Sequence, residues 1–316
     1  MRFVFVMDPV STVIVDEDTS FGLMLEAQAR GHRVDHCLVR DVVLEGGEPR
    51  ASVRRATMRR EPVEPVTLAE AEEVALGEVD AIFVRKDPPF DDEYMWLSLI
   101  LEHLRDRTLV INDPRGLREA NEKLYACHFP QVMPPTLVAA DKRRIRQFVH
   151  EMGGKAIIKP VDGHGGEGVF VLHLGDGNMN ALIETVTRQG TRVAMVQRFL
   201  PEVLQGDKRV ILLDGEPLGA ILRVPKEGDV RSNIHVGGSV VSARIEARDQ
   251  EIVEALGPRL RRDGLYFVGL DVIGGHLTEV NVTSPTGIQQ MSRLDGKNHE
   301  GTVIDWVEDR VRSMGA

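Results

Sequence analysis

Three oxygen-bearing side chains occupy a stretch that otherwise has the pattern of an apolar hairpin. The two arms are residues 264–273 and 277–282. Asp271 lies in the first arm, and Glu279 and Asn281 lie in the second. Residues two apart on a strand share a face, so Glu279 and Asn281 would project together. Hard oxygen ligands of this kind suit Mg²⁺, with phosphate oxygens and water completing the shell.

The geometry of this hairpin depends on its turn. A three-residue turn at 274–276 would pair Asp271 directly with Glu279. The same register would pair Gly269 with Asn281, and Gly269 would leave room for a ligand. A two-residue turn would place Asp271 on the opposite face and spoil the site. Paired carboxylates repel unless a cation lies between them. The alternative is an edge hairpin with solvated acids, which the apolar strands disfavour.

A glycine-dense loop that follows Lys159 offers a second constellation. Its glycines leave backbone amides free to approach an anion closely, and Lys159 adds a point charge for phosphate oxygens. The loop is not a P-loop or a dinucleotide-binding motif, because a strand at 169–173 follows it. A flexible turn is the alternative, but the flanking strands and the lysine favour a lid over a triphosphate. The glycines are Gly163, Gly165, Gly166 and Gly168.

Cationic residues are spread between and beyond these motifs. They are Lys123, Lys208, Arg209, Arg223 and Arg231. Each alone is usually a surface residue, but Arg223 lies in the apolar stretch 218–224, where its charge would need a partner. Residues 226–238 could form a mobile loop that brings Arg231 and Asn233 over the site.

An apolar strand at 193–196 leads to Gln197 and Phe199. Such a strand end beside an aromatic residue can bind a flat base through main-chain groups. A buried strand end without a ligand has the same pattern.

The elements that position these groups differ along the chain. In the first third, short apolar runs alternate with helical patterns, which predicts parallel βαβ units with ligand loops at the strand carboxyl ends. Asp8-Pro9, residues 85–87 and residues 112–114 fall at such ends, although turn chemistry also explains each one alone. The predicted strands are 2–6, 33–38, 81–84 and 108–111, and the predicted helices are 21–30, 94–104 and 114–126.

Local signals add further expectations. Thr19 or Ser20 would cap the helix at 21–30, and Gly31 would end it. The arginine-rich residues 54–60 would form a solvated loop, partly neutralised by the acids that follow. After a linker at 131–135 the chain has a mixed α+β pattern, with Asp214-Gly215 as a tight turn.

The bulk composition limits the class of protein. A length of 316 residues suits two or three packed units. A net charge of −10 argues against a nucleic-acid binder. Two isolated cysteines, Cys37 and Cys127, support neither disulfides nor a zinc site. No signal peptide or membrane-length apolar run is present, so a cytoplasmic protein without a membrane partner is expected.

Taken together, the residues resemble bacterial glutathione synthetase of the ATP-grasp superfamily, and the similarity runs nearly end to end. Its most specific stretches are 267–273 and 277–286, with Asn281-Val282-Thr283-Ser284-Pro285-Thr286. The resemblance implies a chain of α/β and α+β parts: an N-terminal Rossmann-like, parallel-sheet substrate domain at 1–121 and an ATP-grasp fold. The latter comprises a central lid subdomain at 122–200 and a C-terminal catalytic subdomain at 201–316.

The resemblance also implies roles for individual residues. Lys123, Lys159 and the loop glycines would contact the ATP phosphates. The adenosine pocket would contain Gln197, Phe199, Leu200 and Asp207. The ion, Mg²⁺ or Mn²⁺, would be held by Asp271, Glu279 and Asn281. The phosphoryl group or the substrate carboxylates would be contacted by Arg209, Arg223, Arg231 and Asn233. The peptide substrate would be bound by Asp8, Ser20, Arg85, Asp87, Ser284 and Thr286.

The implied reaction joins γ-glutamylcysteine to glycine with ATP through an acyl phosphate, in a homotetramer. His235-Val236 and Gln289-Gln290-Met291 depart from the family pattern. An Arg-Glu pair commonly stands at the second place, so this departure bears on the accepted amine more than on ATP use. The alternatives are a D-alanine–D-alanine-type or glutamate-adding ligase, and a nucleotide-binding protein without catalysis.

Overall fold

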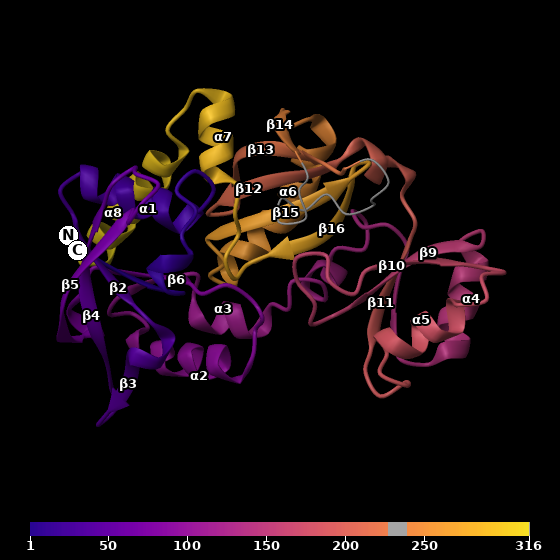
Figure 1. Cartoon of the computed structure of the whole chain (residues 1–316), viewed down its shortest axis with the longest axis horizontal. Helices are drawn as coiled ribbons and strands as arrows, with labels where there is room; N and C mark the ends of the chain where they lie inside the picture. Colours follow the sequence, from indigo (N-terminus) through magenta and orange to yellow (C-terminus); the bar gives the residue numbers. More distant parts are fainter. Residues whose placement is uncertain (227–238, 316) are drawn as a thin grey trace.

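The computed structural model describes residues 1–226 and 239–315. Three β-sheets with their helices lie along the long axis of the molecule (Figure 1). The sheet built from residues 207–281 lies between the other two, and the two chain termini lie together at one end. In the described residues no helix is long and apolar enough to cross a membrane.

The first sheet has seven strands, in the order β3-β4-β2-β1-β6-β7 with β5 paired to β4. Strands β2, β1, β6 and β7 are parallel, as the alternation of strands and helices predicts. The strands are β1 (Arg2–Met7), β2 (Arg33–Cys37), β3 (Val42–Glu45), β4 (Glu48–Met58), β5 (Val66–Ala75), β6 (Ala81–Arg85) and β7 (Leu109–Ile111). The helices are α1 (Thr19–Ala29), α2 (Asp92–Leu101) and α3 (Pro114–Glu119).

The second sheet is antiparallel, in the order β10-β9-β11-β8, and two helices pack on it. Its elements are β8 (Thr136–Ala139), α4 (Lys142–Glu151), β9 (Lys155–Pro160), β10 (Phe170–His173), α5 (Met179–Val186) and β11 (Ala194–Arg198). A buried cluster that includes Ile145, Ile158 and Ile183 joins the helices to the sheet. This unit carries the glycine-dense loop between β9 and β10.

The third sheet is antiparallel, in the order β14-β13-β12-β15-β16. Its elements are β12 (Asp207–Leu213), β13 (Glu216–Val224), β14 (Ser239–Ala243), α6 (Ala247–Arg262), β15 (Phe267–Ile273) and β16 (His276–Asn281). The predicted tight turn between β12 and β13 is present, with positive φ at Asp214 and Gly215. Two last helices follow, α7 (Ile288–Asp295) and α8 (His299–Met314). Residues of α8, including Val303 and Ile304, share a buried cluster with Phe3 and Phe21 of the first unit. The division into domains at residues 121 and 200 stays a prediction.

Several local predictions are wrong. Helix α1 is capped by Asp18, whose side chain accepts a hydrogen bond from Phe21 N (2.8 Å), whereas Thr19 and Ser20 lie inside the helix. The helix predicted over 114–126 ends at Glu119, because the Asn121 side chain accepts bonds from the backbone N of Lys123 and Leu124 and forms a turn.

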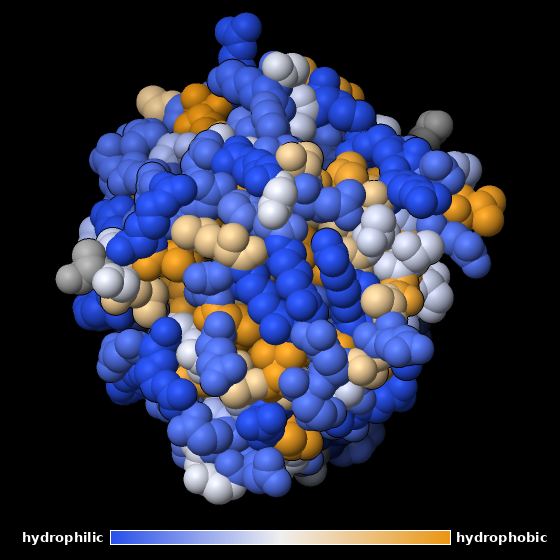
Figure 2. Space-filling model, turned by 90° about the vertical axis from the view of Figure 1, so that its left-hand side faces the viewer, coloured by the Kyte–Doolittle hydropathy of each residue, from blue (hydrophilic) through white to orange (hydrophobic). Residues whose placement is uncertain are grey.

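The arginine-rich residues 54–60 are also not a loop, since residues 54–58 belong to β4. Val53 is buried in the cluster that contains Val4 and Val6, whereas Ala56 and Met58 are buried in the cluster that contains Phe3 and Phe5. Arg54 and Arg55, which lie between them, are both exposed. The buried residues change from one face of β4 to the other between Val53 and Ala56, next to a register shift against β5, so two successive arginines are exposed and the charge run conceals the strand alternation. Figure 2 views the end of the molecule that carries both termini, and hydrophilic side chains cover most of it.

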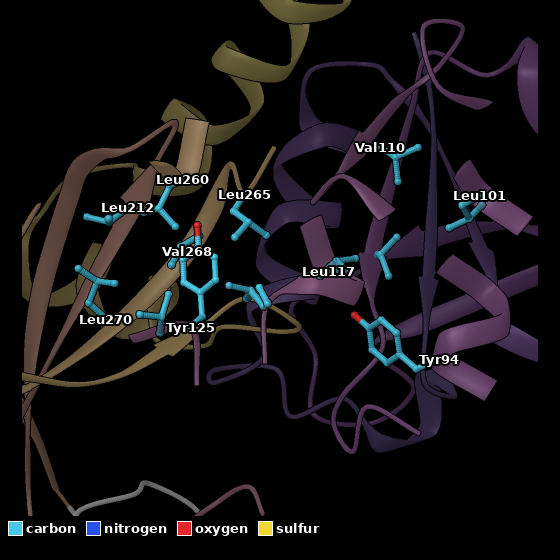
Figure 3. Close-up of a cluster of buried hydrophobic side chains, with 14 of the residues drawn as sticks. Tyr94, Leu101, Val110, Leu117, Tyr125, Leu212, Leu260, Leu265, Val268 and Leu270 are labelled. Atoms are coloured by element: carbon cyan, nitrogen blue, oxygen red, sulfur yellow. The ribbon is translucent and has the colours of Figure 1, made fainter. Parts of the chain in front are cut away.

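One buried cluster joins the first and third units. Figure 3 shows it running from Tyr94 and Leu101 through Leu117 and Leu265 to Leu270. The two units approach so closely at Gly116 that an added Cβ would lie 2.2 Å from the carbonyl oxygen of Asp263. The first and third sheets therefore share a core, which fixes the ends of their strands relative to each other.

Asn112 adds a polar connection at the same boundary. Its Nδ2 donates to the carbonyl oxygens of Phe267 (2.9 Å) and Val282 (2.8 Å), and its Oδ1 accepts from Phe267 N (2.7 Å). The side chain is buried. Asn112 thereby connects the end of β7 to both strands of the β15–β16 hairpin.

We expect Asn112→Leu to lower the free energy of unfolding by roughly 2–4 kcal/mol, because it leaves two buried carbonyls and one buried N–H without partners. Urea denaturation monitored by fluorescence measures this loss. Asn180→Leu, at an exposed position of α5, is the matched control, for which we expect a change within about 0.5 kcal/mol. Equal stabilities of the two variants would contradict the role given to Asn112.

Candidate active site

A cleft of about 520 Å³ lies where the three sheets meet. The predicted site residues come together here from distant parts of the sequence, and all of those within the described residues line the cleft except Gly168. Arg231, Asn233 and the predicted loop beyond Lys226, with His235-Val236, lie outside the described residues.

The hairpin register is as predicted, but the turn that produces it is not. Asp271 pairs with Glu279, and Gly269 pairs with Asn281. The turn has only two residues, because Ile273 pairs with His276. An extra residue on β16 restores the register.

Thr278 is this extra residue, and it forms a β-bulge. Its hydroxyl donates to the carbonyl oxygen of Asp271 (3.0 Å), which secures the irregular ladder. A bulge shifts the pairing by one residue, so Asp271 lies opposite Glu279 despite the short turn. The bulge depends on tertiary contacts, since Thr278 O also accepts from Lys159 Nζ (3.1 Å).

Gly269 does not leave room for a ligand, contrary to expectation. An added Cβ would lie 3.0 Å from Arg209 Cδ and 3.1 Å from Pro285 Cβ. The glycine instead makes room for the Arg209 side chain, which crosses from the neighbouring strand β12.

Asp271 lies in a buried ion cluster. Arg209 forms two bonds to its carboxylate (2.6 and 3.2 Å), and Arg223 approaches to 3.0 Å and also bonds Asp207. Burial by itself would raise the pKa of Asp271, but Arg209 and Arg223 outweigh it and hold the pKa well below the usual value. Burial raises the pKa of Asp207 to about 6, against the opposing effect of Arg223. The partner predicted for Arg223 is therefore a pair of aspartates.

Two buried lysines, Lys123 and Lys159, lie near Glu279. Lys123 donates to Glu279 (2.9 Å) and to the carbonyl oxygen of Gly163. Burial lowers the pKa of Lys159, and the charge of Lys123 lowers it further, while Glu279 opposes both. Cations at 4 % and 7 % exposure carry a desolvation cost that a bound polyanion would offset.

The glycine-dense loop lies beside these lysines. Gly165, Gly166 and Gly168 have φ of +60°, +81° and +70°, a backbone conformation that other residues rarely adopt. Glu167 N bonds the carbonyl oxygen of His164 (3.0 Å), so the loop is a defined turn. Its backbone lines the cleft wall.

The predicted base pocket lies at the end of β11. Gln197 is buried and donates to Thr136 Oγ1 (3.1 Å), while Phe199 and Leu200 line the cleft. The Lys155 ammonium lies 3.5 Å from the centre of the Phe199 ring, a cation–π contact that holds this ring. Lys155 has no site role in the sequence prediction.

The opposite end of the cleft lies at the carboxyl ends of β1 and β6, which are neighbours in the parallel sheet. Asp8 accepts from Asp87 N (3.0 Å) and pairs with Lys86 (3.1 Å). Arg85 is buried and donates to Ser20 Oγ (3.0 Å) and Pro285 O (3.0 Å). Ser284 and Thr286 line the same end.

Sequence reasoning missed Glu122. It accepts hydrogen bonds from the backbone N of Val282 (2.9 Å) and from the N (3.1 Å) and hydroxyl (2.9 Å) of Thr283. It thus connects the entrance to the second unit with the end of the β16 strand. Its position beside Lys123 in the sequence is the only signal, and a carboxylate next to a lysine is too common to be diagnostic.

The hairpin residues carry the oxygen donor atoms that a hard divalent cation prefers. Asp271 and Glu279 supply carboxylates, and Asn281 donates its Nδ2 to Gly269 O (3.2 Å), which leaves its amide oxygen as the ligand atom. Among the described residues, no three His, Cys, Asp or Glu side chains form a metal cluster. Two carboxylates and an amide would leave coordination positions for phosphate oxygens and water.

Comparisons with known proteins agree over nearly the whole chain. Residues 1–118 match the model of the prokaryotic glutathione synthetase N-terminal domain, and residues 122–296 match that of the prokaryotic glutathione synthetase ATP-grasp domain. The chain belongs to the prokaryotic glutathione synthetase family. Glutathione synthetase of Gloeobacter violaceus is 46% identical over 318 residues, covering 99% of this chain and 98% of the relative. That of Synechocystis sp. is 46% identical, covering 98% and 99%.

Solved structures of other proteins share the fold at low sequence identity. D-cycloserine synthetase DcsG superposes with a TM-score of 0.66 at 16% identity, covering 98% of this chain and 100% of the other. The ATP-grasp ligase PsnB with its minimal precursor gives a TM-score of 0.65 at 17% identity, covering 97% and 98%. The predicted fold class, an ATP-grasp fold behind an N-terminal parallel-sheet domain, is therefore confirmed.

Burial and the charge of Glu279 raise the pKa of Glu122, although bonds from Thr283 and Val282 oppose them. A carboxyl with a raised native pKa stabilises the fold most below its unfolded pKa, and this contribution is lost as pH rises through the native value. We therefore expect Glu122→Gln to melt at a higher temperature than the wild type at pH 8. The gap should close towards pH 4, where the wild-type carboxyl is protonated. Differential scanning fluorimetry across this range tests it, and a gap that widens at low pH would contradict the assignment.

Proposed function

We propose that this chain is a glutathione synthetase, which joins γ-glutamylcysteine to glycine and converts ATP to ADP and phosphate. The observation that carries the proposal is the cleft itself. It combines a carboxylate-bearing hairpin, two buried lysines and a glycine loop in a chain that the family models match over residues 1–118 and 122–296. The same relatives support an ATP-dependent ligase.

ATP would lie between the second and third sheets. Its base would lie beside Gln197, Phe199 and Leu200, with Asp207 towards the ribose, and all four residues line the cleft. Its phosphates would lie beside Lys123, Lys159 and the loop glycines. In the free protein Lys123 bonds Glu279 and Arg209 bonds Asp271. With ATP bound, both cations would donate to phosphate oxygens.

A Mg²⁺ or Mn²⁺ ion would be held by Asp271, Glu279 and Asn281. When bound, it would neutralise phosphate charge and polarise the transferring phosphoryl group. Asp271 suits this role because its lowered pKa keeps it ionised at any physiological pH.

The peptide substrate would lie at the end lined by Asp8, Ser20, Arg85 and Asp87. Its carboxylate would attack the γ-phosphorus, which gives an acyl phosphate and ADP. The glycine amine would then attack the acyl carbon, and phosphate would leave after a tetrahedral intermediate. Arg209 and Arg223 would stabilise the charge that develops on oxygen. Ser284 and Thr286 line the cleft where the new peptide end would lie.

The loop Gly163–Gly168 would exclude water from the acyl phosphate, which water otherwise hydrolyses. Arg231 and Asn233, predicted to reach the same group, keep that role as a prediction. We further propose that the protein is a cytoplasmic homotetramer, and light scattering of the purified protein tests its size.

Purified protein with ATP and Mg²⁺ should form ADP at a high rate only when both γ-glutamylcysteine and glycine are present. A coupled ADP assay with each substrate omitted in turn measures this. ATP binding without ADP formation would favour the nucleotide-binding protein. ADP formation with D-alanine or glutamate acceptors, but not with this pair, would favour the related ligases.

We expect Lys159→Met to weaken ATP binding at least tenfold, because a phosphate partner is lost. The same change removes a desolvated cation, so the unliganded variant should melt no lower than the wild type. Isothermal titration calorimetry and thermal melting give the two values. Lys155→Met is a useful comparison because Lys155 belongs to the same strand, β9, but contacts the Phe199 ring. A Lys159→Met variant that melts lower yet binds ATP normally would assign Lys159 a structural role.

A further inference from the structure

Thr278, the residue that forms the β-bulge, has hydrogen bonds on two sides. Its hydroxyl donates to the carbonyl oxygen of Asp271 on β15 (3.0 Å). Its own carbonyl oxygen accepts from Lys159 Nζ on β9 (3.1 Å). Thr278, Asp271 and Lys159 all line the cleft. A single residue therefore connects the strand that carries a proposed metal ligand with a lysine of the second unit.

The hydrophobic core selects the bulged register. Without the bulge, the two-residue turn would place Glu279 opposite Leu270. Leu270 is fully buried, so the carboxylate would enter the core. With the bulge, Val280 lies opposite Leu270 and is buried in the same cluster. The core thus prevents a slip of the whole strand, and the Thr278 hydroxyl is left to set the position of the backbone within the bulge.

The carbonyl of Thr278 faces a different part of the chain. Strand β16 is the last strand of its sheet, so its outer N–H and C=O groups have no neighbouring strand. Leu277 N instead donates to the carbonyl oxygen of Val132 (2.9 Å), and Thr278 O accepts from Lys159. The Lys159 side chain is buried and makes no other hydrogen bond or ion pair within the described residues. Its ammonium group should therefore move when the Thr278 carbonyl moves.

We propose that Thr278 is a positioning residue for both the metal ion and the phosphates of ATP. The inference rests on the proposed function and deepens it. The Thr278 hydroxyl fixes the bulge so that Asp271 and Glu279 present their carboxylates together. The Thr278 carbonyl holds the Lys159 ammonium group at the cleft. A displacement at Thr278 alters the carboxylate pair and the cation at once, as supporting residues behind a site commonly do.

Thr278→Val keeps the β-branched shape and removes only the hydroxyl. We expect it to weaken the binding of ATP with Mg²⁺ about three- to tenfold, the range for loss of one hydrogen bond. At saturating ATP, it should raise by a similar factor the Mg²⁺ concentration that gives half of the ligand-induced rise in melting temperature. Isothermal titration calorimetry and differential scanning fluorimetry give the two values. Thr278→Ser keeps the hydroxyl and should restore both.

A double-mutant cycle tests the link to Lys159. In a Lys159→Met background the Thr278 carbonyl has no ammonium group to hold. Thr278→Val should then weaken ATP binding by a smaller factor than it does in the wild type. Equal factors in the two backgrounds would overturn the assignment of Thr278 to Lys159.

Thr108→Val is the matched control away from the cleft. Thr108 is buried, and its hydroxyl donates to the carbonyl oxygen of Leu76 over the same distance, 3.0 Å. This variant also loses one bond from a hydroxyl to a backbone carbonyl, so it should melt lower than the wild type. Its affinity for ATP and its Mg²⁺ requirement should stay at the wild-type values.

The role of Thr278 would be structural alone if Thr278→Val melted lower, as the control does, but bound ATP with Mg²⁺ as the wild type does. That result would overturn the inference. If the wild type meanwhile forms ADP with γ-glutamylcysteine and glycine, the proposed function stands. A wild type that binds no ATP in the presence of Mg²⁺ would overturn the proposed function itself.

Discussion

The burial of charge at the β15–β16 hairpin is the constraint on which the site depends. Asp271 is buried against Arg209 and Arg223, and Glu279 is bonded to Lys123. Each carboxylate is buried or half-buried and has a cation beside it, so neither is left uncompensated. The cations belong to three different segments, and the hairpin therefore determines how those segments meet.

The same pairing prepares the cleft for its ligands. A cation that bonds a carboxylate in the free protein can bond a phosphate oxygen once that carboxylate binds a metal ion. The cation and the carboxylate then each still have a partner of opposite charge. Lys159 has only the carbonyl oxygen of Thr278 as a bonded partner among the described residues, and its pKa is lowered by burial. The protein retains a destabilised cation at the place where a polyanion is expected, as functional sites commonly do.

The scaffold holds this hairpin from the other side. Asn112 and Glu122 bond the backbone at Phe267, Val282 and Thr283, and a shared hydrophobic core joins the first and third sheets. Side-chain bonds to backbone fix the strand ends within a narrow range, which a site that must place two substrates and a nucleotide requires. The substrate end of the cleft thereby keeps a fixed position relative to the phosphate end.

The sequence by itself determined the parallel strands, the oxygen-rich hairpin, the glycine loop and, through family resemblance, the ATP-grasp fold. The strands, the hairpin and the loop follow from local periodicity and spacing, which a linear pattern carries, whereas the fold came from the resemblance alone. Only the tertiary structure decided that a bulge at Thr278, and not a longer turn, brings Asp271 opposite Glu279. It also decided that Gly269 accommodates Arg209, that β4 is a strand, and that Glu122 belongs to the cleft. Their surroundings come from residues far away in the chain, so their burial and partners cannot be read from neighbours in sequence.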